Sequence, residues 1–320
     1  MNFLAILAAL GLEQWSAFHW RVAVERSFVQ YARGIEHRFN GGTTQHGLFA
    51  LVVAIAPPVL IAAAVFFFAD RMHPLLGLLW NVAVLYFLMG FRRFSHCVSE
   101  IIAALKANEL AAARRALAKW GGGATSDLSS EDVARLSIER GFVDAYRQMF
   151  AVLFWFAILP GPAGAVLYRA AALLAEEWKG EVPGAEPSSL VQARTEFGRP
   201  ARQLLALLDW IPVRLTALSF AIVGDFEDAV ACWRTQARLW AKQDGGVAIG
   251  ILLASGGGAL GVQLGGPLPV LAGDPDARPE LGIGDPVEPE ILPSAVGLVW
   301  RALILWLLLI LMLTLANIAP

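Results

Sequence analysis

Long apolar runs recur along this chain and set its organisation. The clearest cover residues 48–68, 75–91, 203–223 and 295–318. A helix that spans a bilayer needs about 20 predominantly apolar residues, and these runs reach or approach that length. Only the short polar stretch 70–74 separates the first two runs, which predicts an antiparallel helical hairpin. The pattern predicts an all-α, polytopic integral membrane protein with about 4–5 membrane-embedded helical segments.

A further apolar stretch, residues 148–174, is interrupted in its middle by Pro160-Gly161-Pro162. Each half holds only about a dozen residues, which is too few to cross a bilayer. We expect a re-entrant hairpin here, since irregular backbone at membrane depth is tolerated where protein covers it. A single kinked span is the alternative.

Amphipathic stretches flank the apolar runs. Residues 13–39 and 224–242 place apolar side chains at helical spacing, with arginines on other faces, and we expect interfacial helices. Asn40-Gly-Gly ends the first of these helices, and Gly121-Gly122-Gly123 is expected to end the Ala/Leu-rich helix that precedes it. Ser129 or Ser130, followed by Asp132 and an apolar-periodic run, predicts the N-cap of a helix.

The glycine-rich stretch 255–266 has neither the spacing nor the setting of a dinucleotide-binding loop. Its glycines instead predict close backbone approach between packed segments. With the Pro- and Gly-rich loop that follows, the chain is expected to form one membrane domain, 1–320, made of six segments. These are an N-terminal amphipathic helix (1–45), a helical hairpin (46–91), a cytoplasmic helical segment (92–147), a core with polar motifs (148–266), the loop (267–294) and a C-terminal span (295–320).

Composition and charge narrow the class further. Hydrophobic residues make up 57% of the chain and charged residues 16%, whereas soluble domains carry about 25% charged residues. The net charge of −2 argues against a nucleic-acid partner, which usually needs a basic face. Cys97 and Cys232 lie far apart and predict neither a metal site nor a disulfide framework. Nine basic residues in 92–147, against Arg71 alone in the preceding turn, place 92–147 in the cytoplasm.

The run 203–223 differs from the others because Asp209, Pro212 and Arg214 lie near its centre. A charge at that depth costs at least ~2.5 kcal/mol on insertion scales, so it normally faces protein or water. We expect an intramembrane polar site, with both charges buried and engaged by partners from the other polar segments, namely Arg140, Asp144 and Arg169. The alternative is a helix at the interface with both charges in the headgroups.

Several motifs, in this order, resemble the CobD/CbiB family, the adenosylcobinamide-phosphate synthases of cobalamin biosynthesis. They are Ile-Glu-Arg-Gly-Phe-Val-Asp at 138–144, Leu-Phe-Trp at 153–155, Pro-Gly-Pro-Ala-Gly-Ala-Val-Leu-Tyr-Arg at 160–169, Ile-Pro-Val-Arg-Leu-Thr-Ala at 211–217 and Gly-Ala-Leu-Gly-Val-Gln-Leu-Gly-Gly at 258–266. Residues 12–15 and 207–215 look more like AmpE, a sister branch of inner-membrane proteins linked to β-lactamase regulation. Both resemblances imply a multi-pass protein of the bacterial inner membrane.

The departures from the family pattern bear on chemistry. Asparagine and acidic positions of the synthases fall on Ala172, Ala175, Leu205 and Ala206, and the family's asparagine falls on Asp209. Those groups are the hard oxygen donors that could bind Mg²⁺ with a nucleotide, so Mg²⁺ and ATP are expected only if the synthase activity is retained. The remaining candidates for polar or anion-binding roles are Asp132, Glu139, Arg140, Asp144, Arg169, Asp209 and Arg214. Ordinary pairing of charges at helix ends is the alternative for each.

Two functions follow from the resemblance. One is a cobalamin-pathway, ligase-like membrane protein with eroded catalytic motifs. The other is an AmpE-like, non-catalytic regulatory protein. A transporter is less favoured, because no pair of broken helices occupies symmetric halves. The partners expected are the lipid bilayer, a corrinoid or phosphate-bearing small molecule, and a protein or a second copy of this chain.

Overall fold

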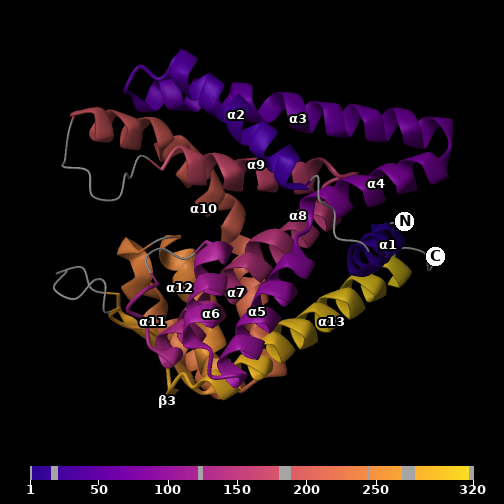
Figure 1. The fold of residues 1–320 in the computed structure, drawn as a ribbon. Helices are drawn as coiled ribbons and strands as arrows, with labels where there is room; N and C mark the ends of the chain where they lie inside the picture. Colours follow the sequence, from indigo (N-terminus) through magenta and orange to yellow (C-terminus); the bar gives the residue numbers. More distant parts are fainter. Residues whose placement is uncertain are drawn as a thin grey trace. The chain divides into compact units, whose positions relative to one another are not determined.

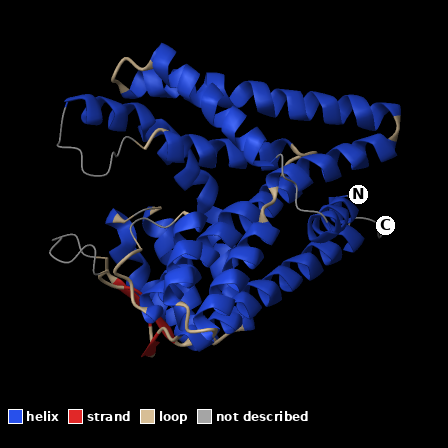
Figure 2. Ribbon diagram, viewed as in Figure 1, coloured by secondary structure: helices blue, strands red, loops and turns tan. Residues whose placement is uncertain are grey.

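The computed structural model describes residues 2–15, 21–121, 125–179, 189–243, 245–268 and 278–316. Helices dominate these ranges, as Figures 1 and 2 show, with three short strands as the exception. The expected all-α class is confirmed. Three helices are long and apolar enough to cross a membrane by length and composition, and they cover Thr44–Met72, Arg194–Val223 and Pro289–Ala316.

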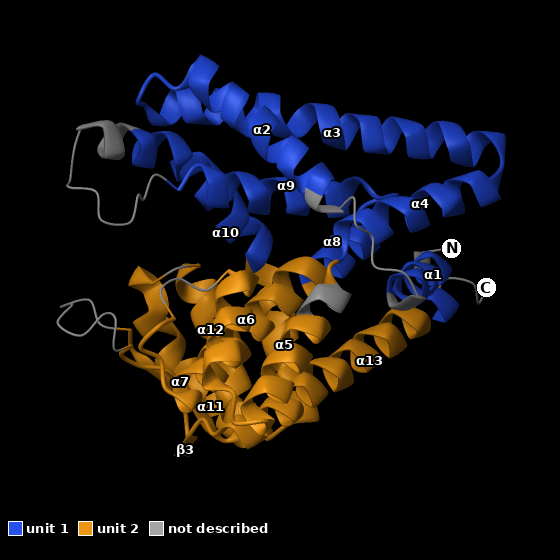
Figure 3. Cartoon of the chain, in the orientation of Figure 1, with its two compact units in different colours: residues 1–89, 151–209, 314–320 blue, residues 90–150, 210–313 orange. Residues whose placement is uncertain are grey.

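The chain divides into two compact units, coloured separately in Figure 3. Unit 1 comprises Met1–Met89, Ala151–Asp209 and Thr314–Pro320, and unit 2 comprises Gly90–Phe150 and Trp210–Leu313. Each unit therefore joins segments that lie far apart in the sequence. The single membrane domain of six segments expected from the sequence stays a prediction.

Unit 1 is built from helices that pack side by side. They are α1 (Asn2–Trp15), α2 (Arg21–Phe39), α3 (Thr44–Met72), α4 (Pro74–Leu88), α8 (Ala151–Ile158), α9 (Ala163–Glu177) and the first part of α10 (Ser189–Val223). The helices α3 and α4 form the predicted hairpin, and the indole Nε1 of Trp80 donates to the carbonyl of Ala62 across it. The helix α3 is continuous through Pro57-Pro58.

The stretch 148–174 follows the path of a hairpin. The short helices α8 and α9 pack against each other, and the chain reverses between them at Gly161, whose φ is +65°. A β-carbon at Gly164 would lie 2.1 Å from the carbonyl oxygen of Trp155, so the glycine permits this close packing. The re-entrant placement of this hairpin in the bilayer stays a prediction.

Unit 2 gathers the remaining elements. Its helices are α5 (Phe91–Lys106), α6 (Leu110–Trp120), α7 (Ser130–Ala145), the π-helix η1 (Tyr146–Phe150), the rest of α10, α11 (Phe226–Gln236), the 3-10 helix η2 (Ala237–Lys242), α12 (Gly246–Leu260), the 3-10 helix η4 (Pro289–Ile291) and most of α13 (Leu292–Ala316). Two helix-end predictions are confirmed here. Ser129 and Asp132 form a capping box at the start of α7, and Gly121 ends α6 in the left-handed conformation.

The core of unit 2 is α12, which is buried along most of its length and packs against α11 and η2. Its glycines lie directly on backbone. A β-carbon at Gly250 would lie 2.3 Å from the carbonyl oxygen of Ala237, and one at Gly258 would lie 2.5 Å from that of Asp228. The predicted close approach at the glycine-rich stretch is therefore present.

Residues 269–277 of the predicted Pro- and Gly-rich loop lie outside the described residues, and the described part after them contains two short strands that the prediction of a loop did not include. Strands β1 (Val262–Gly265), β2 (Glu280–Gly282) and β3 (Asp285–Pro286) form a small sheet in the order β2-β1-β3. The β1–β2 pair is antiparallel and the β1–β3 pair is parallel. The sequence gives little sign of these strands, because two to four residues are too few for an alternating pattern to show.

Candidate functional site

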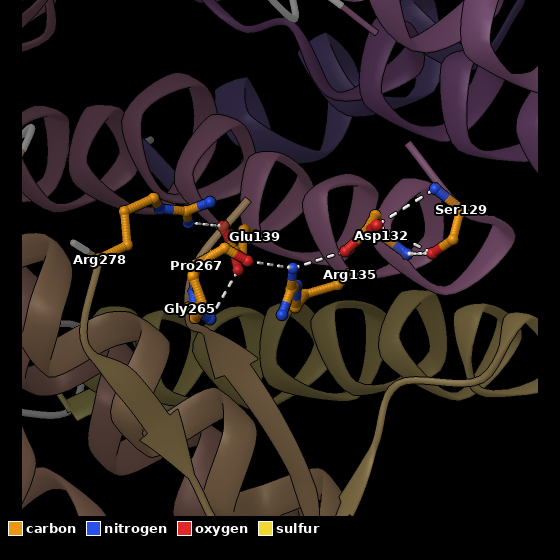
Figure 4. Close-up of polar contacts among 7 residues, drawn as sticks. All are labelled: Ser129, Asp132, Arg135, Glu139, Gly265, Pro267 and Arg278. Atoms are coloured by element: carbon orange, nitrogen blue, oxygen red, sulfur yellow. Dashed lines mark hydrogen bonds and ion pairs between the residues drawn. The ribbon is translucent and has the colours of Figure 1, made fainter. Parts of the chain in front are cut away.

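Four of the seven candidate residues lie on α7 in unit 2. Asp132 and Glu139 are seven residues apart and share one face of the helix with Arg135, which the sequence reasoning had not singled out. Figure 4 shows this face directed toward the segment that carries Gly265, Pro267 and Arg278. The polar residues of α7 therefore meet a segment more than a hundred positions later in the chain.

Glu139 is the buried centre of this cluster. Its side chain is 7% exposed, and its Oε1 accepts a hydrogen bond of 2.7 Å from the backbone N–H of Gly265. Its Oε2 forms an ion pair with the guanidinium of Arg278, which is 12% exposed and lies 5.1 Å from the centroid of the Trp240 ring. A buried charge needs such pairing and hydrogen bonding to be tolerated. Glu139 thus ties β1, and Arg278 just before β2, to α7.

Asp132 and Arg135 make a second connection to the same segment (Figure 4). The Oδ2 of Asp132 accepts hydrogen bonds from the backbone N–H and the hydroxyl of Ser129, at 3.1 and 2.9 Å. Its Oδ1 binds Nη2 of Arg135 at 2.6 Å, and the same Nη2 donates to the carbonyl of Pro267 at 3.1 Å. Asp132 is therefore occupied by the helix cap and by Arg135.

Asp144 and Arg140 lie toward the end of α7. The Oδ2 of Asp144 accepts a hydrogen bond of 2.8 Å from the indole Nε1 of Trp120 on α6. Its Oδ1 lies 3.7 Å from Nε of Arg140, whose side chain is 45% exposed. Asp144 holds α6 against α7, while Arg140 contributes a looser surface pair.

Arg169 lies in unit 1, on α9, where ion pairs connect α2 to its neighbours. Its Nη2 binds Oε1 of Glu25 on α2. Two further pairs join Arg33 to Glu177 at 2.6 Å and Glu36 to Arg194 at 2.8 Å. The hydrogen bond and the negative charge of Glu177 raise the pKa of Arg33 above its ordinary value. These pairs link α2 to α9 and α10.

Asp209 and Arg214, the two charges within α10, have different surroundings. Asp209 is buried, as predicted, and its Oδ1 accepts a hydrogen bond of 2.8 Å from the hydroxyl of buried Tyr168. Arg214 is only half-buried. Its guanidinium lies 4.4 Å from the centroid of the exposed Trp210 ring and donates to the Trp210 carbonyl, one turn earlier. The expectation that both charges are buried is therefore wrong for Arg214, because its long side chain folds back along its own helix.

The partners expected for that pair are used elsewhere. Asp144 contacts Trp120 and Arg140, and Arg169 contacts Glu25. Sequence reasoning missed Arg135, Arg278 and Tyr168. Arg135 had a local signal, since it stands three residues after Asp132 on a predicted helix, and Tyr168 precedes Arg169 in the motif at 160–169, whereas Arg278 had none.

Within the described ranges, no group of three or more His, Cys, Asp or Glu side chains is placed to hold a metal ion. The four carboxylates among the candidates instead bind backbone, indole, hydroxyl or guanidinium groups of the same unit. These hydrogen bonds and ion pairs hold neighbouring helices together and hold the small sheet against α7.

Comparisons with known proteins converge on one family. The family model described as "CobD/Cbib protein" matches residues 4–299. Among curated proteins, "Cobalamin biosynthesis protein CobD" of Stutzerimonas stutzeri (strain A1501) is 34% identical over 314 residues, which cover 97% of this chain and 97% of the relative. The protein of the same name from Chromobacterium violaceum is 34% identical over 284 residues, or 89% and 84% of the two chains. No solved structure matches this chain.

Proposed function

This chain belongs to the CobD/CbiB family, and from that premise we propose that it is a multi-pass inner-membrane protein that serves cobalamin biosynthesis with its ATP-dependent amide-forming chemistry lost or strongly weakened. Membership of the family supports the role in cobalamin biosynthesis. The contacts made by the candidate carboxylates support the loss of the amide-forming activity.

The observation that carries the proposal is that the candidate carboxylates are already engaged. Glu139 is bound by Gly265 and Arg278, Asp132 by Ser129 and Arg135, and Asp209 by Tyr168. Mg²⁺ prefers free oxygen ligands together with substrate phosphates. These residues do not fit a Mg²⁺–ATP site unless those contacts break.

The positions that match acidic or amide residues of the synthases add support. Ala172 and Ala175 lie on α9 and are buried, so they leave neither a ligand nor space for a larger polar group. Leu205 on α10 is likewise apolar. Phosphoryl transfer depends on positioning and on stabilisation of charge, and methyl groups supply neither.

A second candidate is a fully active synthase. It is favoured by the 34% identity that extends over 97% of both this chain and the Stutzerimonas relative. A third, the AmpE-like regulatory protein, is favoured by residues 207–215, where Asp209 bonds Tyr168 within the protein.

Purified protein given ATP, Mg²⁺, cobyric acid and aminopropanol phosphate tests the proposal. We expect no amide product, while the Stutzerimonas relative, purified in the same detergent, serves as the control for assay conditions. Appearance of cobinamide phosphate, the amide of these two substrates, at a rate comparable to that of the relative would establish the active synthase instead.

Deletion of the gene separates the remaining alternatives. If the protein serves the pathway, the deletion strain should show impaired cobalamin-dependent growth. If its amide-forming activity is lost, expression of this chain should not rescue a strain that lacks the synthase. Normal cobalamin-dependent growth of the deletion strain would favour the AmpE-like function.

A further inference from the structure

We infer that the groove between α2 and α3 is a binding site for an anionic phospholipid, with Arg38 as the residue that recognises the headgroup phosphate. The groove has a volume of about 710 Å³ and lies within unit 1. Its lining is Tyr31, Gly34, Ile35, His37, Arg38, Phe39 and Val53. This site is separate from the candidate polar residues, and it does not depend on the proposed function.

One wall of the groove belongs to α3, a helix that is long and apolar enough to cross a membrane. Tyr31, which lines the groove, is 40% exposed, and on α3 Phe49 is 57% exposed and Leu48 and Val52 are exposed as well. Such a continuous apolar surface on a soluble face would be unfavourable. Beside a helix that crosses a membrane, the same apolar surface can pack against the acyl chains of a lipid.

Two contacts hold the groove open as a defined shape. The hydroxyl of Tyr31 donates to the carbonyl of Val53 at 2.9 Å, and the rings of Phe39 and Phe49 meet with centroids 5.4 Å apart. Between them stands Gly34, where a β-carbon would find no atom within 4 Å. The missing side chain at this helical position leaves the groove its space.

The charge at the rim favours an anion. Tyr31 and Arg38 are seven residues apart and therefore lie on one face of α2. The nearby carboxylates are neutralised, since Glu36 pairs with Arg194 and Glu177 pairs with Arg33. In the part of the chain that the structure describes, Arg38 has no ion pair or side-chain hydrogen bond. A guanidinium suits a phosphate geometrically, and a Lys or Arg near a membrane attracts anionic lipid.

Native mass spectrometry of the detergent-purified full chain tests this, with phosphatidylglycerol and phosphatidylcholine offered at equal concentration. We expect wild-type protein to retain phosphatidylglycerol preferentially. Arg38→Gln should weaken that retention about fivefold, the effect of one basic side chain near the surface. Gly34→Leu should abolish the preference, because it places a side chain in the groove at a position where a β-carbon would find no atom within 4 Å, and leucine is a better helix former than glycine.

Matched variants control for general effects. Gly11→Leu changes a helical glycine that also has open space around it, and Arg71→Gln removes an exposed arginine at the other end of α3. Both should keep the wild-type preference. Equal retention of the two lipids by wild type would overturn the inference. So would an unchanged preference in Arg38→Gln and Gly34→Leu, or displacement of phosphatidylglycerol by millimolar inorganic phosphate, which would identify a site for a free anion.

Discussion

At the scale of single residues, buried and half-buried carboxylates connect the elements of this protein. Glu139 joins α7 to β1 and Arg278, Asp144 joins α6 to α7, and Asp209 joins α10 to Tyr168 on α9. Each carboxylate accepts hydrogen bonds from groups of its own unit, as buried polar groups must. Their value to the protein lies in holding elements that are distant in sequence.

Removal of Arg278 should show how strongly one such connector acts. Arg278→Ala strands the buried Glu139 carboxylate, and loss of one partner of a buried pair typically costs about 3–5 kcal/mol. The free energy of unfolding in detergent should fall by that amount. Arg140→Ala is the control on the same helix, because its exposed pair with Asp144 is worth about 0–1 kcal/mol. Equal losses in the two variants would contradict the role assigned to Glu139.

At the scale of elements, α12 shows why glycine recurs in this sequence. Gly250 and Gly258 lie against the backbone of Ala237 and Asp228, so α12 packs on α11 and η2 without intervening side chains. Gly261 has a different reason, since its β-carbon would meet nothing but its φ is +67°. Space requires glycine at the first two positions and conformation requires it at the third.

A pair of substitutions separates these effects from a general intolerance of change. Gly258→Ala forces a methyl group to within 2.5 Å of the Asp228 carbonyl oxygen, and we expect a loss of stability of about 1–3 kcal/mol, as for overpacking. Gly297→Ala on α13 has nothing within 4 Å and should be neutral or stabilise by up to about 1 kcal/mol through helix propensity. Thermal unfolding in detergent measures both. If Gly258→Ala melts like Gly297→Ala, the close contact is not a constraint.

At the scale of the whole molecule, local signals in the sequence predicted the elements well and their partners poorly. The α3–α4 hairpin, the Ser129 cap and the Gly121 end follow from residues within a few positions of each other. The Glu139–Arg278 and Glu25–Arg169 pairs join residues 139 and 144 positions apart, and no local pattern indicates them. The three short strands were not predicted for the same reason, since they are defined by pairing with distant residues and not by a pattern in their own sequence.

Membrane topology is the prediction that belongs to this scale. The excess of basic residues in 92–147 predicts that this segment lies in the cytoplasm and that the turn after α3 lies on the opposite side. In a background without Cys97 and Cys232, Asp127→Cys and Asp70→Cys should react with an impermeant maleimide from opposite sides of the membrane. Modification of both from the same side would disprove this topology.

The ion pairs of α2 also carry information about direction. Glu25 meets Arg169 and Arg33 meets Glu177, with the same separation of 144 residues, so α2 and α9 run parallel. Along α2 the charges read minus then plus, and along α9 they read plus then minus. If α2 docked in the reverse direction, Glu25 would face Glu177 and Arg33 would face Arg169, and like charges would repel. The order of the charges thus allows α2 to pack on α9 in the parallel direction only.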